Sequence, residues 1–186
     1  MRIPILGVAL LVAPGLAFGQ AWSDPGLGLG LQGGISKGTS AAATVPVARL
    51  HARYRVTGMV GVELAAGTLN DELADSGERI LRLSEIQVTG SFVFFFLYDH
   101  PVQPYLLAGG GYYYVVEKGL GPLEGLRRTE HVFGFHAGAG VDVKLSRRLS
   151  LFLDARVTQL GLTAVEPRFG GTANSRAVVL GVNAYF

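Results

Sequence analysis

The chain has 186 residues, a length typical of one domain, and apolar residues make up 49% of it while charged residues make up only 16%. The formal net charge of +2 comes without any basic run, which argues against a nucleic-acid-binding protein. The sequence contains no cysteine, which excludes disulfides, thiolate metal ligands and a cysteine nucleophile.

The first residues have the pattern of a secretory signal peptide. Met1-Arg2 supplies a positive start, an apolar run follows from Ile5 to Ala13, and small residues lie at the positions that a signal peptidase recognises before the preferred cleavage point after Gly19. Cleavage after Ala21 is the second choice. An uncleaved anchor helix is the alternative, but the apolar run is short for a bilayer span.

We therefore expect residues 1–19 to be a signal peptide and residues 20–186 to form one exported domain. No later stretch supplies about eighteen unbroken apolar residues, so no transmembrane helix is predicted. The exported chain is nevertheless apolar. Only a closed barrel lets such a chain cross a membrane without helices, because every backbone polar group must be paired there.

Eight stretches of this domain alternate between apolar and polar residues, which is the period of a β-strand. In chain order they are Gly26–Ile35, Val45–Arg55, Met59–Leu69, Ile80–Leu97, Gln103–Glu117, His131–Leu145, Leu149–Leu160 and Arg176–Phe186. In the last stretch, every second residue from Val178 to Phe186 is apolar, and such a strand of about ten residues is typical of a transmembrane barrel.

The distribution of charge between the two faces predicts which solvent each face meets. One face carries Leu, Val, Ala and Phe, and the other carries almost all the charge. A soluble sandwich or a lipocalin-like barrel would place the apolar face inside and the charge outside, but the chain has too few charges to cover an aqueous exterior. The predicted fold is an all-β, eight-stranded antiparallel up-and-down transmembrane β-barrel.

The connections between the stretches alternate in length, as expected when short turns lie on the periplasmic side and long loops lie outside. The short ones are Thr57-Gly58, Asp99–Pro101 and Ser146–Arg148; the long ones are Thr39–Thr44, Asn70–Glu78, Gly119–Thr129 and Gly161–Ser175. A hairpin centred on Thr57 would place His51 opposite Glu63, and one centred on Ser146 would place His136 opposite Arg156.

The polar face is predicted to line the lumen of the barrel. Its candidate residues are Arg49, His51, Arg53, Glu63, Glu85, His136, Asp142, Asp154 and Arg156. Side chains fill an eight-stranded barrel, and unpaired buried charges are costly, so these charges should pair. The pairs form either a polar plug or a narrow ion path that opens when Arg156 changes partner among Asp142, Asp154 and Glu85.

No constellation of catalytic, cofactor or metal residues stands out. The four histidines have no nucleophile partner that the sequence identifies, and no histidine and carboxylate set has the spacing of a metal site. His136 is interpreted as a packing residue of the lumen. The glycines from Gly109 to Gly111 are expected in mid-strand, where small residues let a barrel curve, and not in a phosphate-binding loop.

Three segments resemble small eight-stranded outer-membrane barrels, the family that includes the barrel domain of outer membrane protein A. They are Pro104–Tyr114, Phe135–Asp142 and Leu149–Arg156. The terminal Tyr185-Phe186 is similar to the signal that the barrel-assembly machinery recognises. The resemblance implies a monomer in the bacterial outer membrane, in contact with lipid and lipopolysaccharide and assembled by that machinery, without nucleic acid.

The resemblance leaves three functions open. The favoured one is a structural or surface-interaction role through the extracellular loops, and the alternative is a passive channel for ions or small solutes. A lipid-modifying enzyme is less favoured. Outer-membrane lipid A deacylases carry a His-x-Ser-Asn arrangement near the carboxy terminus, and no histidine here is followed by it.

Overall fold

The computed structural model describes residues 26–38, 44–75, 78–120, 124–160 and 174–186. The predicted signal peptide and both cleavage points lie outside these residues. Within the described part of the chain, no helix is long and apolar enough to cross a membrane.

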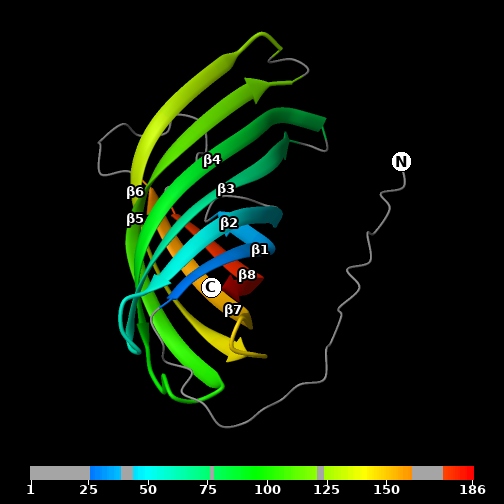
Figure 1. Cartoon of the computed structure of the whole chain (residues 1–186). Helices are drawn as coiled ribbons and strands as arrows, with labels where there is room; N and C mark the ends of the chain where they lie inside the picture. The colour runs from blue at the N-terminus through cyan, green and yellow to red at the C-terminus, as the bar shows by residue number, and fades with distance from the viewer. Residues whose placement is uncertain (1–25, 39–43, 76–77, 121–123, 161–173) are drawn as a thin grey trace.

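Eight antiparallel strands form one closed barrel, which confirms the predicted fold class (Figure 1). They are β1 Gly26–Gly38, β2 Val45–Arg55, β3 Val60–Asp75, β4 Glu78–Phe95, β5 Val102–Gly119, β6 Arg127–Lys144, β7 Leu149–Leu160 and β8 Asn174–Tyr185. Each strand pairs with the next one in the chain, and β8 pairs with β1 to close the wall. The closed ladder leaves no sheet edge, so the backbone is satisfied without water.

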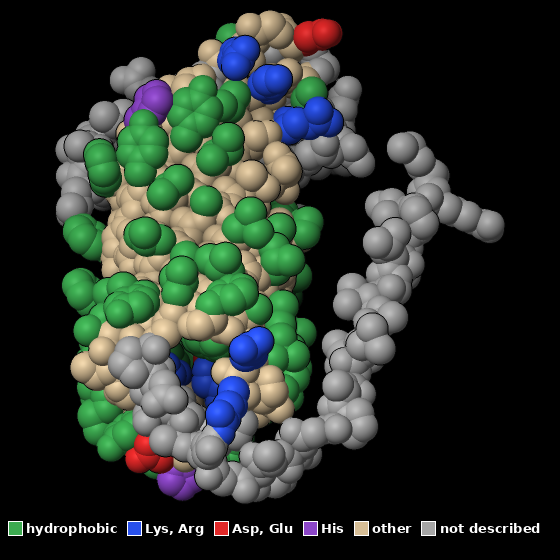
Figure 2. Space-filling view, viewed as in Figure 1, with side chains coloured by type: hydrophobic (Ala, Val, Ile, Leu, Met, Phe, Trp, Pro, Cys, Tyr) green, Lys and Arg blue, Asp and Glu red, His purple; other side chains and the backbone are tan. Residues whose placement is uncertain are grey.

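The two faces of the strands meet different surroundings. The apolar side chains point outward: Leu64 is 66% exposed and Phe92 is 72% exposed. The intervening charged side chains point inward, and Arg53 is 0% exposed while Glu63 is 1% exposed. A band of apolar side chains covers the outer wall, with charged side chains gathered toward the two ends (Figure 2). This distribution suits a lipid exterior and a polar interior.

Four neighbouring strands are several residues longer than the other four and clearly exceed the length that a membrane requires. β3, β4, β5 and β6 have 16, 18, 18 and 18 residues, whereas β2, β7 and β8 have 11, 12 and 12. A tilted strand needs about 9–11 residues to cross the bilayer. The wall is therefore taller on one side, where these hairpins extend past the others (Figure 1).

The loop expected at 70–78 is wrong, because the β3–β4 ladder continues through most of it. Asn70 pairs with Ser84 and Asp75 pairs with Glu78, with a register shift between Leu73 and Ala74. The expected loop from Gly119 to Thr129 likewise includes the start of β6. Polar composition suggested loops there, but a paired hairpin outside the bilayer needs no apolar face.

The two predicted hairpin registers are also wrong, each by two residues. Arg53, not His51, lies opposite Glu63, and Thr158, not Arg156, lies opposite His136. The first turn is fixed by the amides of Val56 and Thr57, which both donate to the carbonyl of Val60. A slip of two residues preserves the face of every side chain, so alternation alone did not detect it.

A charge placed in the middle of the apolar band tests the solvent of the outer wall. Leu64→Arg should lower the free energy of unfolding by about 2–4 kcal/mol in phospholipid vesicles, because the guanidinium would meet hydrocarbon. Leu126→Arg is the matched control, since Leu126 is 58% exposed but precedes β6 outside the band; its effect should stay within about 0.5 kcal/mol. Equal small effects in denaturant titrations would indicate an aqueous exterior.

Candidate functional site

Six of the charged side chains in the barrel interior form a series that alternates in sign. In order they are Lys144, Asp142, Arg53, Glu63, Arg156 and Asp154, and successive nitrogen–oxygen distances are 3.3, 3.7, 2.6, 3.0 and 2.8 Å. The five sequence-predicted members come from four strands, and Lys144 was not among the candidate site residues. We call this set the lumenal charge chain. Its three cations and three anions give it no net charge.

Arg53 lies at the centre of the lumenal charge chain and is packed among aromatic rings. Its Nε and Nη2 both donate to Glu63 Oε2, at 3.0 and 2.6 Å. Its guanidinium carbon lies 5.0 Å from the ring centroid of Tyr105 and 5.1 Å from that of Phe152. The rings exclude water from the ion pair and attract the cation through their π faces, so this part of the lumen is both filled and fixed.

A second cluster lies beside the chain toward the short turns. The Arg55 guanidinium stacks 3.9 Å from the centroid of Phe95, and its Nη2 donates to Gln103 Oε1 at 2.6 Å. The Lys144 ammonium lies 3.9 Å from the ring centroid of Tyr185, whose hydroxyl donates to Asp142 Oδ2 at 3.3 Å. Tyr185, predicted only as part of an assembly signal, therefore also contacts the lumenal charges, while the adjacent Phe186 is 80% exposed.

Three lumenal hydrogen bonds cross a glycine on the strand between their partners. His51 reaches Asn183 across Gly30, Ser91 reaches His136 across Gly109, and Tyr105 reaches Asp154 across Gly140. A Cβ at Gly30 would overlap His51 Cε1, and one at Gly140 would lie 2.5 Å from Tyr105 Cζ. These inward glycines leave the space through which long side chains meet across two strand spacings.

The remaining candidate residues lie apart from the chain. Arg49 and Glu85 form no ion pair among the described residues; Arg49 is buried and Glu85 is half-buried. The hydrogen bond of His51 goes to Asn183, and the hydrogen bond of His136 goes to Ser91. Arg156 contacts Asp154, one of its three proposed partners, and also Glu63, which the sequence did not pair with it.

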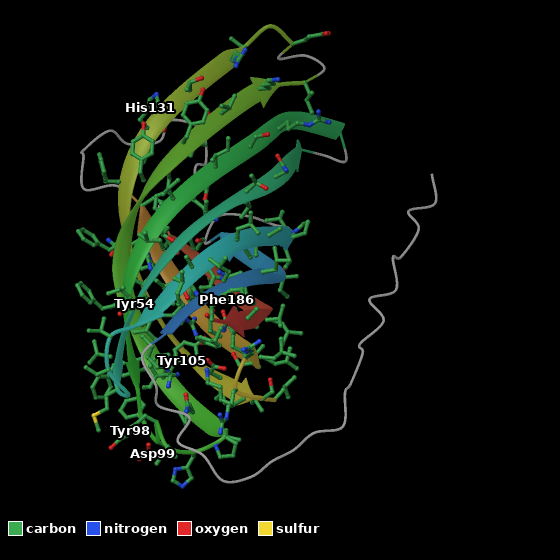
Figure 3. The ribbon with its side chains drawn as sticks, viewed as in Figure 1. Tyr54, Tyr98, Asp99, Tyr105, His131 and Phe186 are labelled. Carbon is green, nitrogen blue, oxygen red and sulfur yellow. The ribbon has the colours of Figure 1, made fainter. Side chains whose placement is uncertain are left out.

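Sequence reasoning missed the aromatic and amide residues that complete the lumenal cluster. Gln103, Tyr105 and Asn183 are buried and point inward. Tyr105 lies within the wall in Figure 3, whereas Tyr98 and Asp99 lie at the short-turn end and His131 lies toward the other end. Their inward positions follow from the period-two alternation of β5 and β8, but an aromatic residue carries no charge to mark the lumenal face.

The described residues contain one hydroxyl–imidazole pair of interest to catalysis. Ser91 Oγ and His136 Nε2 share a hydrogen bond of 2.7 Å, but both residues are buried in the lumen, and His136 Nδ1 has no hydrogen-bond partner in the described part of the chain. The third group that orients the base in a catalytic triad is therefore missing among those residues. No group of three or more histidine or carboxylate side chains in the same ranges is arranged to hold a metal ion.

A closed barrel with an apolar exterior and a charged, filled lumen defines a transmembrane β-barrel protein. Residues 3–186 match the family model of the outer membrane protein beta-barrel domain. The chain belongs to this family, which places it in the bacterial outer membrane. A comparison with curated proteins finds no match.

Solved structures share the fold at low sequence identity. Neisserial surface protein A (NspA) is 17% identical with a TM-score of 0.66, covering 87% of this chain and 97% of that one. The N-terminal β-barrel domain of Pseudomonas aeruginosa OprF is 12% identical with a TM-score of 0.59, covering 88% and 100%. The outer membrane enzyme PagL is 15% identical with a TM-score of 0.50, covering 84% and 98%. The fold is thus shared by proteins that include an enzyme.

Removing charges singly or in pairs tests the alternation of the lumenal charge chain. Arg53→Met or Glu63→Leu alone should cost about 3–5 kcal/mol of unfolding free energy, because each leaves an uncompensated buried charge. The double variant should cost less than either single variant, since it leaves two neutral pairs, Lys144 with Asp142 and Arg156 with Asp154.

The control for this cycle is Glu85→Leu, which removes a lumenal carboxylate outside the chain and should cost under about 1 kcal/mol. Unfolding in phospholipid vesicles by denaturant supplies all four values. Costs that simply add in the double variant would contradict charge compensation.

Two glycines of β1 test the packing of side chains across glycine. Gly30→Ala should lower the unfolding free energy by about 1–3 kcal/mol, because the new Cβ would overlap the His51 ring and the Val182 carbonyl. Gly33→Ala is the matched control on the outer face, where the nearest atom lies 3.9 Å away. It should be neutral or stabilising by about 0.5–1 kcal/mol. The same denaturant titration compares the two, and a cost at Gly33 equal to that at Gly30 would argue against the packing.

Proposed function

We propose that this outer-membrane barrel is a structural and surface-interaction protein whose lumen is closed. The observation that supports the closed lumen is the lumenal charge chain, which joins β2, β3, β6 and β7 across the interior. Each member of the lumenal charge chain has at least one opposite partner, so these six charges need no mobile ion to compensate them. A lumen filled in this way favours a function that is performed by the segments outside the membrane and not by the lumen.

The extended part of the wall supports the second half of this proposal. β3 to β6 continue past the length needed to span the bilayer and form two paired hairpins. Binding residues concentrate where a rigid scaffold carries variable segments. The two hairpins therefore supply a rigid surface for interaction, in place of the long loop predicted at 70–78.

A narrow ion channel is the second candidate, and one link of the lumenal charge chain favours it. Arg53 Nη1 lies 3.7 Å from Asp142 Oδ2, and Nη1 has no hydrogen-bond partner among the described residues. This is the longest link in the chain. Separation of Arg53 from Asp142 would divide the chain into a neutral pair and a four-charge segment and would open a polar path between them.

A lipid-modifying activity is a weaker candidate. The fold is shared with an outer membrane enzyme, PagL. The Ser91–His136 pair of this chain faces the lumen, where a membrane lipid has no access. Proteins of one fold carry unrelated functions, so the shared fold by itself supplies no argument for catalysis.

Conductance of the refolded protein in a planar bilayer tests the closed lumen. The wild-type protein should insert without discrete current steps, because the lumenal charge chain blocks ion passage. Discrete steps whose ion selectivity changes in Arg156→Ala would contradict the proposal and favour the channel. Arg176→Ala is the matched control, since Arg176 lies exposed on the outer face of β8.

A further inference from the structure

Three cations lie side by side on the outer wall, where the longest strands end. Arg82 of β4 pairs in register with Lys118 of β5, and Lys118 pairs with Arg127 of β6. All three side chains are exposed. Lys and Arg side chains gather at this end of the barrel, above the apolar band (Figure 2). Adjacent strands lie about 4.8 Å apart, so the row spans about 10 Å.

The rows beneath these cations change gradually from polar to apolar. The next outward row consists of Ser84, Val116 and Thr129; the row after it consists of Ile86, Tyr114 and His131; and the third consists of Val88, Tyr112 and Phe133. Rows on one face are about 6.6 Å apart along the strand. The order from aromatic to hydroxyl to cationic side chains is the order of chemical groups from the edge of the hydrocarbon into a lipid headgroup layer.

The height of the cationic row above the apolar band agrees with a position in the headgroup layer. On β4 and the turn after it, the apolar band begins at the outward side chain of Ile86 and ends at that of Phe96. The ten residue steps from Ile86 to Phe96 correspond to about 33 Å along the strand, or about 25 Å along the membrane normal at a tilt of about 40°. Arg82 lies four residues beyond Ile86, about 10 Å further along the normal, at the level of the headgroups.

Two of the three charges have no ion-pair partner among the described residues. Lys118 and Arg127 form no ion pair with any described residue, and they are neighbours in the register. Glu117, the carboxylate next to Lys118 in the chain, is buried on the lumenal face. Arg82 has Glu72 as its register partner on the other side. The Lys118–Arg127 end of the row is therefore where an anion would be held.

We propose that Arg82, Lys118 and Arg127 form a binding site for the phosphate of a sugar-based lipid headgroup in the leaflet that surrounds this end of the barrel. Arginine binds phosphate through two parallel hydrogen bonds, and lysine adds a compact charge. Ser84 and Thr129, one row lower, offer hydroxyl groups to the sugar. The acyl chains then extend along the apolar rows beneath. The proposal depends on the membrane location and is independent of whether the lumen conducts or the hairpins bind a partner.

The test measures lipid retention by the refolded full chain in nanodiscs of phosphatidylcholine. The discs contain either bisphosphorylated lipid A or the same lipid without its phosphates, and native mass spectrometry counts the lipid that stays with the released barrel. The wild-type protein should retain the phosphorylated lipid preferentially. Lys118→Gln with Arg127→Gln should weaken this retention about 30-fold, or about fivefold for each charge removed.

The matched control removes two exposed charges at the other end of the barrel. Arg147→Gln with Arg148→Gln, in the turn after β6, should leave lipid retention unchanged. Lys118→Arg with Arg127→Lys keeps both charges and should retain the phosphorylated lipid as the wild-type protein does. Heat-dependent gel mobility confirms that every variant is folded. Equal retention of dephosphorylated lipid, or equal loss in the control, would overturn the proposal. A second contrary result would be binding of a soluble sulfated sugar by the wild-type protein together with equal retention of the two lipids. This result would assign the cationic row to a different ligand and would also overturn the proposal.

Discussion

Arg53 lies fully buried between Glu63 and Asp142, and the polar filling of the barrel depends on how these charges compensate one another. A guanidinium without partners in an eight-stranded lumen would be costly. Each cation of the lumenal charge chain has an anion beside it, on its own strand or on another strand, so this alternating series has no net charge. The same pairing tethers β2 to β3 and β6, and β3 to β7, from the inside, in addition to the backbone ladder that closes the wall.

Compensation requires side chains to meet across strands, and this explains the inward glycines. A bond from Tyr105 to Asp154 crosses Gly140, and one from His51 to Asn183 crosses Gly30. A side chain on the strand between the partners would fill that space. The abundance of glycine in this chain is therefore partly a packing requirement of a narrow polar lumen, besides its effect on the curvature of the wall.

The outer wall follows the opposite requirement, because it must match the layers of a membrane. Its apolar rows have the height of a bilayer core, its aromatic rows lie at the upper edge, and its cationic row lies beyond them. The lumen and the wall are thus two separate chemical systems on alternate residues of the same strands. The side chain of Lys118 lies on the outer face of β5, while the side chain of its neighbour Glu117 faces the lumen.

The sequence by itself determined the number of strands, the face of each side chain and the membrane class, because all three follow from period-two alternation. It placed Arg53, Glu63 and Arg156 inside and offered three partners for Arg156, of which the structure shows one, Asp154. Only the tertiary structure decided those partners, since Glu63 and Arg156 are far apart in the chain and meet across the lumen. It also decided the registers, because a shift of two residues leaves the faces unchanged and the hydrogen bonds of the turns select between the alternatives. The extension of the β3–β4 hairpin lay beyond sequence reasoning for a related reason: outside the bilayer, backbone pairing stabilises strands whose side chains carry no alternating pattern.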